Sequence, residues 1–209
     1  MSGSDNRRGV LIVLEGIDGV GKTTQADAIT QFVEESGRTV VRSREPTMGK
    51  YGARLRRSMQ EGRLSASEEL DLFLRDRGEH VETLIEPSLA AGSVVLLDRY
   101  YFSTVAYQSL RGFDAEALLA QNEAFAPAPE LLLVLDMDPR VGLARGRSRS
   151  GQAPDSFEVP EDLQQSRRIF LELASRYGYA HVINADQASE QVTSDILKVV
   201  GEMLKEKMI

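Results

Sequence analysis

The segment Gly16-Ile-Asp-Gly-Val-Gly-Lys-Thr23 constrains this chain more than any other. It follows the apolar run Val10–Leu14 and precedes the amphipathic stretch from Thr24 to Glu35, so it lies between a predicted strand and a predicted helix. Its glycines let the backbone turn sharply and point N–H groups at an anion, and the helix adds the positive end of its dipole. Lys22 then reaches the outer phosphates of a nucleotide, and the Thr23 hydroxyl can ligate Mg²⁺. The segment therefore predicts a phosphate-binding P-loop.

Length and composition limit the kind of protein that this chain forms. Its 209 residues suffice for one sizeable core, so we expect one domain over residues 1–209, with residues 1–8 as a flexible tail. A formal net charge of -7 argues against nucleic-acid binding, because such proteins are more often basic. The chain contains no cysteine, which excludes disulfides and cysteine-bound metal. We also expect a cytoplasmic protein with no membrane partner, since no apolar segment of membrane-spanning length occurs.

Strand and helix patterns alternate along the whole chain, which is typical of a parallel sheet covered by helices on both faces. Five short apolar segments, rich in leucine or β-branched residues, have the pattern of buried parallel strands. They are Val10–Leu14, Thr39–Ser43, Val94–Asp98, Leu131–Asp136 and His181–Asn184. The sequence thus predicts an α/β fold with a five-stranded parallel sheet flanked by helices.

Helix start signals predict helices in the segments between and after these strands. Ser65-Ala-Ser-Glu68 has the pattern of a capping box, and we expect the helix that it opens to run to about Leu84 or beyond, with Pro87 ending or kinking it. Further helices are expected after Asp138-Pro139, from Pro160 to about Tyr177-Gly178, and from about Glu190 to Lys207.

A polar stretch rich in Gly and Ser lies between two of these helices, at about residues 145–158. Its composition predicts a mobile segment, and Arg145, Arg147 and Arg149 suit a lid that closes over phosphates. A closing arginine stabilises the charge on a phosphoryl group during its transfer. A solvated basic helix end that favours the local dipole explains these arginines equally well.

Charged side chains follow two predicted strands at their carboxyl ends, where ligands bind in open α/β sheets. Asp98 ends one strand and Arg99 follows it; in P-loop enzymes an acid at this place lies near Mg²⁺. Arg44 follows another strand and can reach a phosphate, while Pro46 can form a wall. For this second group a plain strand exit is an equally good explanation.

After Arg99, a predicted helix carries polar side chains on one face. Ser103 and Tyr107 share that face at i, i+4 spacing, and Thr104 and Gln108 lie beside them. Hydroxyls, an amide and a ring together suit a planar base and its sugar. An ordinary exposed polar face remains the alternative.

The long predicted helix places Phe73 and Arg77 at i, i+4 spacing, so that a ring and a guanidinium can point into one cavity. The ring can stack on a base, and the guanidinium can donate to base carbonyls. From spacing alone we favour a core position for Phe73 and a surface ion pair of Arg77 with Asp76 or Glu79. The two histidines, at positions 80 and 181, are isolated, so we expect neither metal binding nor acid–base work from them.

Taken in order, four segments resemble the thymidylate kinase family of P-loop nucleoside monophosphate kinases, and the likeness extends from Val10 to about Val200. The last segment is the most specific, since a P-loop alone indicates only an NTPase or a kinase. The segments are Glu15–Gln25, Arg44–Pro46, Phe73–Arg77 and Asp98–Gln108. The resemblance implies a P-loop kinase fold with a short arginine-containing lid, and a homodimer with the long helix at its interface. It also implies transfer of the γ-phosphoryl group of ATP to dTMP, giving dTDP and ADP, in dTTP synthesis.

The resemblance further implies roles for single residues. Lys22, Arg99, Asp18 and a lid arginine would be catalytic, and Mg²⁺ would lie between Thr23 and Asp98. The residues implied for ATP are Gly16, Ile17, Asp18, Gly19, Val20, Gly21, Lys22, Thr23, Thr24 and Arg145. Those implied for dTMP are Asp18, Arg44, Pro46, Phe73, Arg77, Arg99, Ser103, Thr104, Tyr107 and Gln108. Among these, Arg44 and Arg99 would hold the phosphate, Phe73 would stack on thymine, and Tyr107 would pack where a ribose 2′-hydroxyl would lie.

Three segments depart from the family's common pattern. Thr47-Met48-Gly49 replaces Gly-Gly-Thr after Pro46, so the contacts of that loop stay open. Phe73-Leu-Arg-Asp-Arg77 replaces Phe-Ala-Ala-Asp-Arg and keeps both base contacts. Ser156 stands where many lids have an arginine, and Gly19 stands where other members have a P-loop arginine. The catalytic cation must then come from residues 145, 147 or 149, and we favour Arg149.

Two other functions remain open at this point. A kinase for another nucleoside monophosphate, or for a nucleoside, would carry the same P-loop. A nucleotide-dependent binding module without phosphoryl transfer is supported only by the missing lid arginine at Ser156.

Overall fold

The computed structural model describes residues 8–150 and 160–206. Five strands form one sheet in the order β2-β3-β1-β4-β5, and every neighbouring pair is parallel. The strands are β1 (Val10–Glu15), β2 (Val40–Arg44), β3 (Val94–Asp98), β4 (Leu131–Asp136) and β5 (Ala180–Asn184). The predicted five-stranded parallel sheet is therefore confirmed.

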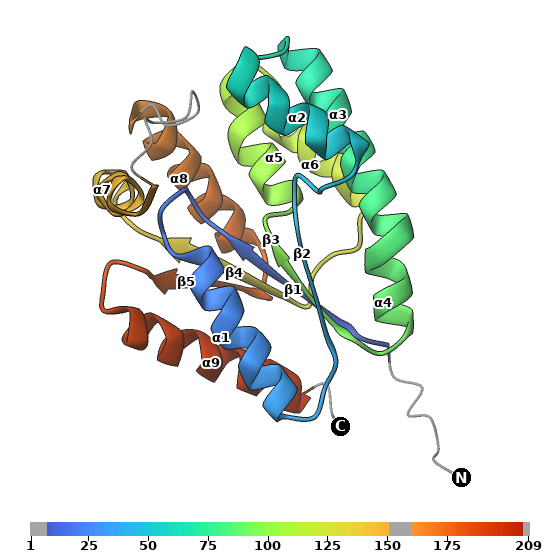
Figure 1. The fold of residues 1–209 in the computed structure, drawn as a ribbon, viewed down its shortest axis with the longest axis vertical. Helices are drawn as coiled ribbons and strands as arrows, with labels where there is room; N and C mark the ends of the chain where they lie inside the picture. Colours follow the sequence, from blue (N-terminus) through green and yellow to red (C-terminus); the bar gives the residue numbers. More distant parts are fainter. Residues whose placement is uncertain (1–7, 151–159, 207–209) are drawn as a thin grey trace.

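Helices cover both faces of this sheet (Figure 1). On one face α1 (Lys22–Glu35) and α9 (Ser189–Glu206) pack together, and on the other lie α8 (Pro160–Arg176) and α4 (Glu86–Ala90). The central strands β1, β3 and β4 are buried almost throughout, whereas the edge strands β2 and β5 are partly exposed. Burial on both faces explains why the central strands are continuous apolar runs rather than alternating ones.

A second group of helices lies beyond the carboxyl ends of the strands (Figure 1). It consists of α2 (Lys50–Glu61), α3 (Ala66–His80), α5 (Tyr101–Gln108) and α6 (Ala115–Glu123), with the 3₁₀ turn Ser109–Arg111 after α5. The sequence did not predict α2 or α6. A start signal for α6 was present, because Asp114 accepts a hydrogen bond from the Ala117 amide at 2.8 Å.

The long helix that begins at the predicted capping box takes an unexpected course. Ser65 and Glu68 exchange both capping hydrogen bonds, as predicted. After His80 the chain forms a π-helical turn, Val81–Ile85, and continues as α4. Pro87 does not end the helix, which continues to Ala90. The π-helical turn contains residue 83, whose carbonyl cannot bond to a proline at position 87, so the disturbance that Pro87 predicts falls on the turn before it.

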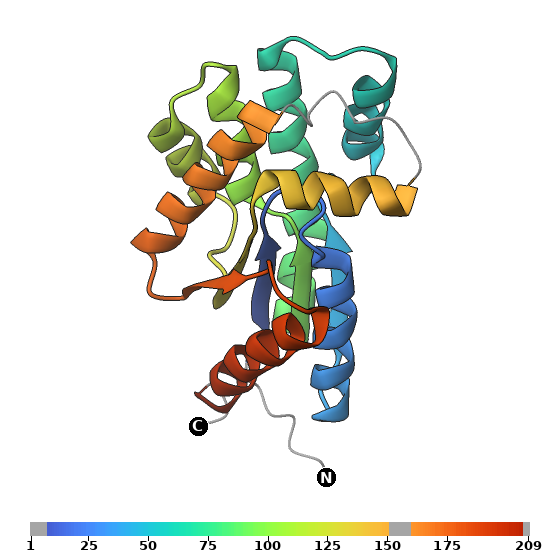
Figure 2. The same ribbon diagram turned by 90° about the vertical axis from the view of Figure 1, so that its left-hand side faces the viewer.

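Helix α7 (Pro139–Ser150) begins where Asp138-Pro139 predicted a start, and the Arg140 amide donates to Asp138 Oδ1 at 2.9 Å. Figure 2 shows α7 lying across the carboxyl ends of the strands. The first residues of the expected lid thus belong to the last turns of α7, and residues 151–159 lie outside the described ones. Within the described part of the chain, none of the helices combines the length and apolarity needed to cross a membrane.

Truncation of the central strand should destabilise the fold. Ile12 in β1 is fully buried, so Ile12→Ala removes apolar contacts and leaves a cavity, and we expect a loss of about 2–5 kcal/mol in the free energy of unfolding. Val182 on the edge strand β5 is 49% exposed, so Val182→Ala should change that energy by less than about 1 kcal/mol. Urea unfolding followed by circular dichroism measures both. Equal losses would contradict the assignment of β1 to the core.

Candidate functional site

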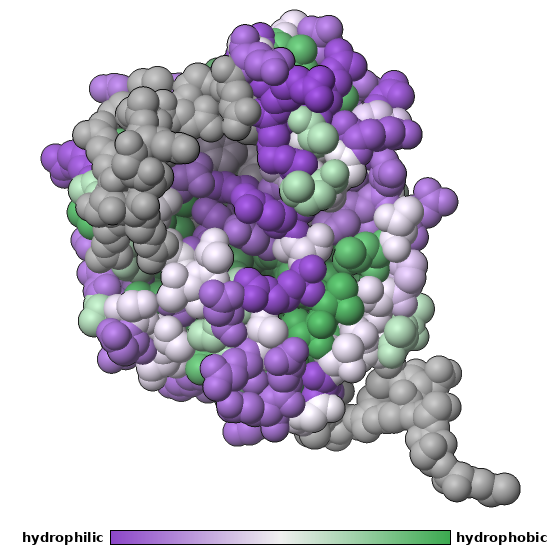
Figure 3. All heavy atoms as spheres, viewed as in Figure 1, coloured by the Kyte–Doolittle hydropathy of each residue, from purple (hydrophilic) through white to green (hydrophobic). Residues whose placement is uncertain are grey.

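A cavity of about 350 Å³ opens at the carboxyl end of the sheet, below the helices α2, α3 and α5. Figure 3 shows hydrophilic side chains gathered around this recess. The structure brings all ten side chains predicted for the acceptor nucleotide to its lining. They are Asp18, Arg44, Pro46, Phe73, Arg77, Arg99, Ser103, Thr104, Tyr107 and Gln108.

The P-loop between β1 and α1 has the backbone that its glycines permit. Gly16, Gly19 and Gly21 all have positive φ, at 132°, 81° and 96°. Lys22 is buried and its Nζ donates to the carbonyl oxygens of Gly16 at 3.0 Å and Ile17 at 2.9 Å. Burial and the positive charge of Arg99 lower the pKa of Lys22 to about 8. The ammonium is therefore held in the loop at an energetic cost that a bound anion would relieve.

A smaller hollow of about 140 Å³ adjoins the P-loop. Thr23 and Asp98 line it together, and Asp98 Oδ1 is buried without a hydrogen-bond partner among the described residues. Hydroxyl and carboxylate oxygens are the donors that Mg²⁺ prefers, and it usually takes few protein ligands and completes its shell with water and phosphate oxygens. The pair therefore fits the predicted metal position.

The P-loop also packs backbone to backbone against the first turn of α7. A Cβ added at Gly19 would lie 2.2 Å from the carbonyl oxygen of Gly142. A side chain at position 19 is thus excluded, and this loop cannot carry an arginine there. The side chains at positions 145, 147 and 149, farther along α7, lie outside the described ones, so their predicted role stays a prediction.

Glu15, which the sequence analysis did not assign a role, joins the P-loop strand to α5. Its carboxylate is fully buried: Oε1 accepts from the amides of Tyr100 at 2.8 Å and Ser103 at 3.0 Å, and Oε2 accepts from Ser103 Oγ at 2.6 Å. Burial raises the pKa of Glu15, and Arg99 offsets part of that rise. The available signal was a carboxylate at the end of an otherwise apolar strand. Ser103, predicted to contact a ligand, is therefore occupied mainly by Glu15.

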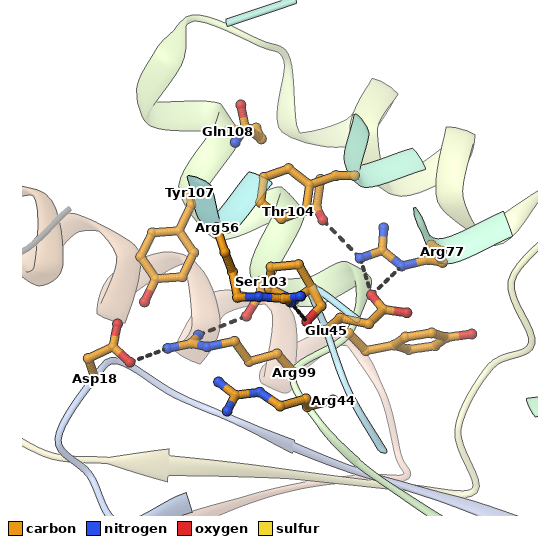
Figure 4. A pocket seen from close by; sticks show the side chains of 13 residues that line it. Asp18, Arg44, Glu45, Arg56, Arg77, Arg99, Ser103, Thr104, Tyr107 and Gln108 are labelled. Carbon is orange, nitrogen blue, oxygen red and sulfur yellow. Dashed lines mark hydrogen bonds and ion pairs between the residues drawn. The ribbon is translucent and has the colours of Figure 1, made fainter. Parts of the chain in front are cut away.

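Arg99 lies between the P-loop and the larger cavity (Figure 4). Its backbone is left-handed, with φ 72°, a conformation that non-glycine residues seldom adopt. Its guanidinium donates to the Gly16 carbonyl at 3.2 Å, to Ser103 Oγ at 3.0 Å and to Asp18 Oδ1 at 2.7 Å. Burial raises the pKa of Asp18, but Arg99 and Lys22 outweigh it and hold that pKa at about 2.

Arg77 is almost fully buried, and the predicted surface ion pair with Asp76 or Glu79 is wrong. Its Nε and one terminal nitrogen donate to Glu45 Oε2 at 2.9 and 2.6 Å, and the same nitrogen donates to Thr104 Oγ1 at 3.0 Å (Figure 4). Its other terminal nitrogen donates to Asn122. The sequence did not reveal this network because its members come from four separate segments. With Phe73, which also lines the cavity, Arg77 takes the ligand-facing alternative rather than the surface one.

The orientation of the Gln108 side-chain amide is set by its hydrogen bond to Glu69. Its Nε2 donates to Glu69 Oε1 at 2.7 Å, and a carboxylate can only accept, so Oε1 is the amide atom left over. This oxygen is buried and has no hydrogen-bond partner among the described residues.

The loop after Pro46, where the sequence departs from the family pattern, is fixed by two side chains that were not predicted. Asp76 accepts from the Thr47 amide at 2.7 Å and from Thr47 Oγ1 at 2.6 Å. Arg56, which also lines the cavity, donates to the carbonyls of Pro46 and Thr47. Arg44, which precedes this loop, makes no hydrogen bond or close ion pair to the described residues and is exposed at the mouth of both hollows.

His80 is not isolated, contrary to the expectation from sequence. It is buried and contacts Glu45 Oε1 through Nδ1 at 3.0 Å and Ser43 Oγ through Nε2 at 2.8 Å. His181 is exposed on β5. Within the described residues, no group of three or more His, Asp or Glu side chains is arranged to hold a metal ion.

Removal of the Glu15 carboxylate should destabilise the junction between β1 and α5. Glu15→Ala leaves the buried amide of Tyr100 without an acceptor, at a cost of about 1–3 kcal/mol, and leaves the Ser103 amide only the Tyr100 carbonyl at 3.1 Å. Glu15→Gln keeps an acceptor oxygen for both amides and should lose less. Unfolding midpoints in urea measure the two variants. Equal losses would show that the acceptor oxygen is not what stabilises this junction.

Comparisons with known proteins agree with this geometry. The family model described as thymidylate kinase matches residues 14–196. A thymidylate kinase of Xanthomonas campestris pv. campestris (strain B100) is 49% identical over 202 residues, which cover 96% of this chain and 86% of that relative. Thymidylate kinases of Xanthomonas oryzae pv. oryzae (strain PXO99A), covered to 86%, and Xylella fastidiosa (strain M12), covered to 90%, are 47% and 46% identical over the same share of this chain. The chain therefore belongs to the thymidylate kinase family.

Proposed function

We propose that this chain transfers the γ-phosphoryl group of ATP to dTMP and gives dTDP and ADP. The observation that carries the proposal is the junction of two hollows. The cavity beneath α3 and α5 and the hollow at the P-loop share Asp18, Arg44 and Arg99. An acceptor phosphate at this junction would meet the donor's terminal phosphate end to end.

The far end of the cavity suits the polar edge of thymine. Thr104 Oγ1 accepts from Arg77, so its own hydrogen is available to donate, together with the remaining N–H of Arg77, to the base O4. Gln108 lines the same cavity one helical turn farther along α5, and its predicted contact with the base stays a prediction. Cytosine presents an amino group in place of O4, so the two donors disfavour it. Phe73 offers a ring for stacking.

The wall next to this edge favours a deoxyribose and a methylated base. Tyr107 lies on the sugar side, with its ring 5.4 Å from the Arg99 guanidinium carbon, and would fill the space of a 2′-hydroxyl. Pro46 would line the space near the 5-methyl group.

Arginines would hold the acceptor phosphate. Arg44 has its guanidinium free for an anion among the described residues, and Arg99 would exchange part of its contact with Asp18 for a phosphate oxygen. The acceptor oxygen is already an anion at neutral pH, so the reaction needs no strong general base. The work of these side chains is to orient two anionic nucleotides and to offset their repulsion. Lys22 would leave the loop carbonyls to bind the β- and γ-phosphates.

Two contributions to the donor side are inferred from fewer observations. Thr23 and Asp98 would hold Mg²⁺, which supplies charge neutralisation to the ATP phosphates. The catalytic cation would come from α7, since Gly19 admits no side chain. Which of Arg145, Arg147 and Arg149 takes this role stays a prediction, and we favour Arg149 as the sequence analysis did. A homodimer through α3 and a cytoplasmic location stay predictions.

A substrate panel at fixed ATP tests the proposed function. We expect dTMP to give dTDP, dUMP to react with a kcat/KM about 10- to 100-fold lower for want of the methyl group, and dCMP to be rejected by at least about 10³-fold. Lys22→Ala is the matched control and should lose turnover while keeping its fold. If ATP and dTMP bind but no dTDP forms, the chain is a binding module. If another monophosphate reacts best, it is a kinase of different specificity.

The lowered pKa of Lys22 predicts proton uptake when ATP binds. At pH 8 about half of Lys22 is neutral in the free protein, and the phosphates favour its charged form, so binding should take up about 0.5 proton. The uptake should fall towards zero at pH 6.5, where the amine is already charged. Titration calorimetry in two buffers of different ionisation enthalpy measures it. Lys22→Arg stays charged at every pH used, and an unchanged uptake in that variant would contradict the assignment.

A further inference from the structure

The Glu45 carboxylate is held from two opposite sides and has little freedom to rotate. It is 3% exposed: Oε2 accepts both hydrogen bonds from Arg77, and Oε1 faces Nδ1 of His80 at 3.0 Å. A carboxylate only accepts, so Nδ1 carries the hydrogen. The terminal torsion of a glutamate is soft on its own. The orientation of this carboxylate therefore depends on its partners, Arg77 at one oxygen and His80 at the other.

His80 is anchored on its far side to the sheet. Its Nε2 lies 2.8 Å from Ser43 Oγ on β2, and Ser43 is two residues before Glu45. His80 and Arg77 are three residues apart on α3, so they lie on one helix face with Glu45 between them. A continuous series of contacts thus runs from Ser43 through His80, Glu45 and Arg77 to Thr104.

His80 itself does not line the nucleotide cavity. Glu45, Arg77 and Thr104 do, whereas His80 and Ser43 line a third hollow, separate from the cavity and from the P-loop hollow, which Glu79 and Thr47 also border. His80 can therefore act on a bound base only through Glu45 and Arg77.

From these contacts we propose that His80 is a positioning residue for base recognition. It fixes the Glu45 carboxylate, which sets the plane of the Arg77 guanidinium and thereby the donors that meet the base O4. The inference rests on the proposed contact between Arg77 and the base. Without the hydrogen bond from His80, Glu45 Oε1 becomes a buried acceptor with no partner, and the carboxylate turns away from its present plane.

Two amide variants separate the two contacts of the ring. The amide of asparagine reaches the place of Nδ1, so His80→Asn keeps a donor for Glu45 and loses Ser43. The amide of glutamine reaches the place of Nε2, so His80→Gln keeps Ser43 and loses Glu45. We expect His80→Gln to raise the KM for dTMP about 10-fold with kcat and the KM for ATP within twofold, and His80→Asn to stay within about threefold of the parent.

A dTMP analogue with hydrogen in place of the base O4, which thereby also lacks the N3–H, supplies the second readout. With no O4 to bind, its KM should be the same for the parent and for His80→Gln. A purely structural role would instead lower the melting temperature of both variants alike and raise every KM together. That pattern, or an unchanged KM for dTMP in His80→Gln, overturns the proposal.

Should His80→Gln not fold, Ser43→Ala takes its place. Ser43→Ala keeps the His80 ring but removes its contact at Nε2. We expect the KM for dTMP to rise two- to fivefold and the KM for the analogue to stay unchanged. No rise in the KM for dTMP overturns the proposal. Arg77→Lys tests the base contact separately. If it loses dTMP and the analogue equally, the proposed base contact is wrong. If Arg77→Lys weakens dTMP more than the analogue and His80→Gln does not, the base contact of Arg77 stands and only the positioning role of His80 is wrong.

Discussion

The buried carboxylate of Glu15 is the contact on which the rest of the site depends. It ends the strand that leads into the P-loop, and it satisfies the first amides of α5, the helix that carries the acceptor-side residues. Arg99 lies between these two elements and has a left-handed backbone. Two hydrogen bonds keep this backbone in place: the Arg99 amide donates to the Leu14 carbonyl, and the Tyr100 amide donates to the Glu15 carboxylate. The P-loop and the helix that lines the cavity are therefore joined by one side chain as well as by packing, as transfer between the proposed donor and acceptor sites would require.

The basic side chains of the site contrast with the negative net charge of the whole protein. The protein has a formal net charge of -7, yet Lys22, Arg44 and Arg99 converge where the two hollows meet. Their mutual repulsion is visible in the lowered pKa of Lys22, to which Arg99 contributes, and is offset by Asp18. A site of this kind is preorganised for anions, because phosphates replace carboxylate and carbonyl partners that already occupy the positions of charge. Association with nucleotides then owes nothing to the overall charge.

The sequence predicted what depends on local pattern and missed what depends on distant pairs. The strands were found because central parallel strands are continuous apolar runs, and residues that line the cavity were found because strand ends converge at one edge. Helix α2 was missed although it is amphipathic, because its few apolar residues lie among arginines and no capping side chain marks its start at Gly49. Glu15, Glu45 and His80 were missed because their partners lie 32 or more residues away, so only the fold gives these polar side chains a reason to be buried. The same lack of context made Arg77 look like a surface residue.

The close approach of Gly19 and Gly142 connects the P-loop to the lid. Two backbones in contact leave no room for a side chain at position 19, so the arginine that other members carry in the P-loop has no place here. Arg99 is turned toward Asp18 on the acceptor side. The donor-side cation proposed above is therefore sought on α7, which follows β4 and whose first turn packs against the P-loop.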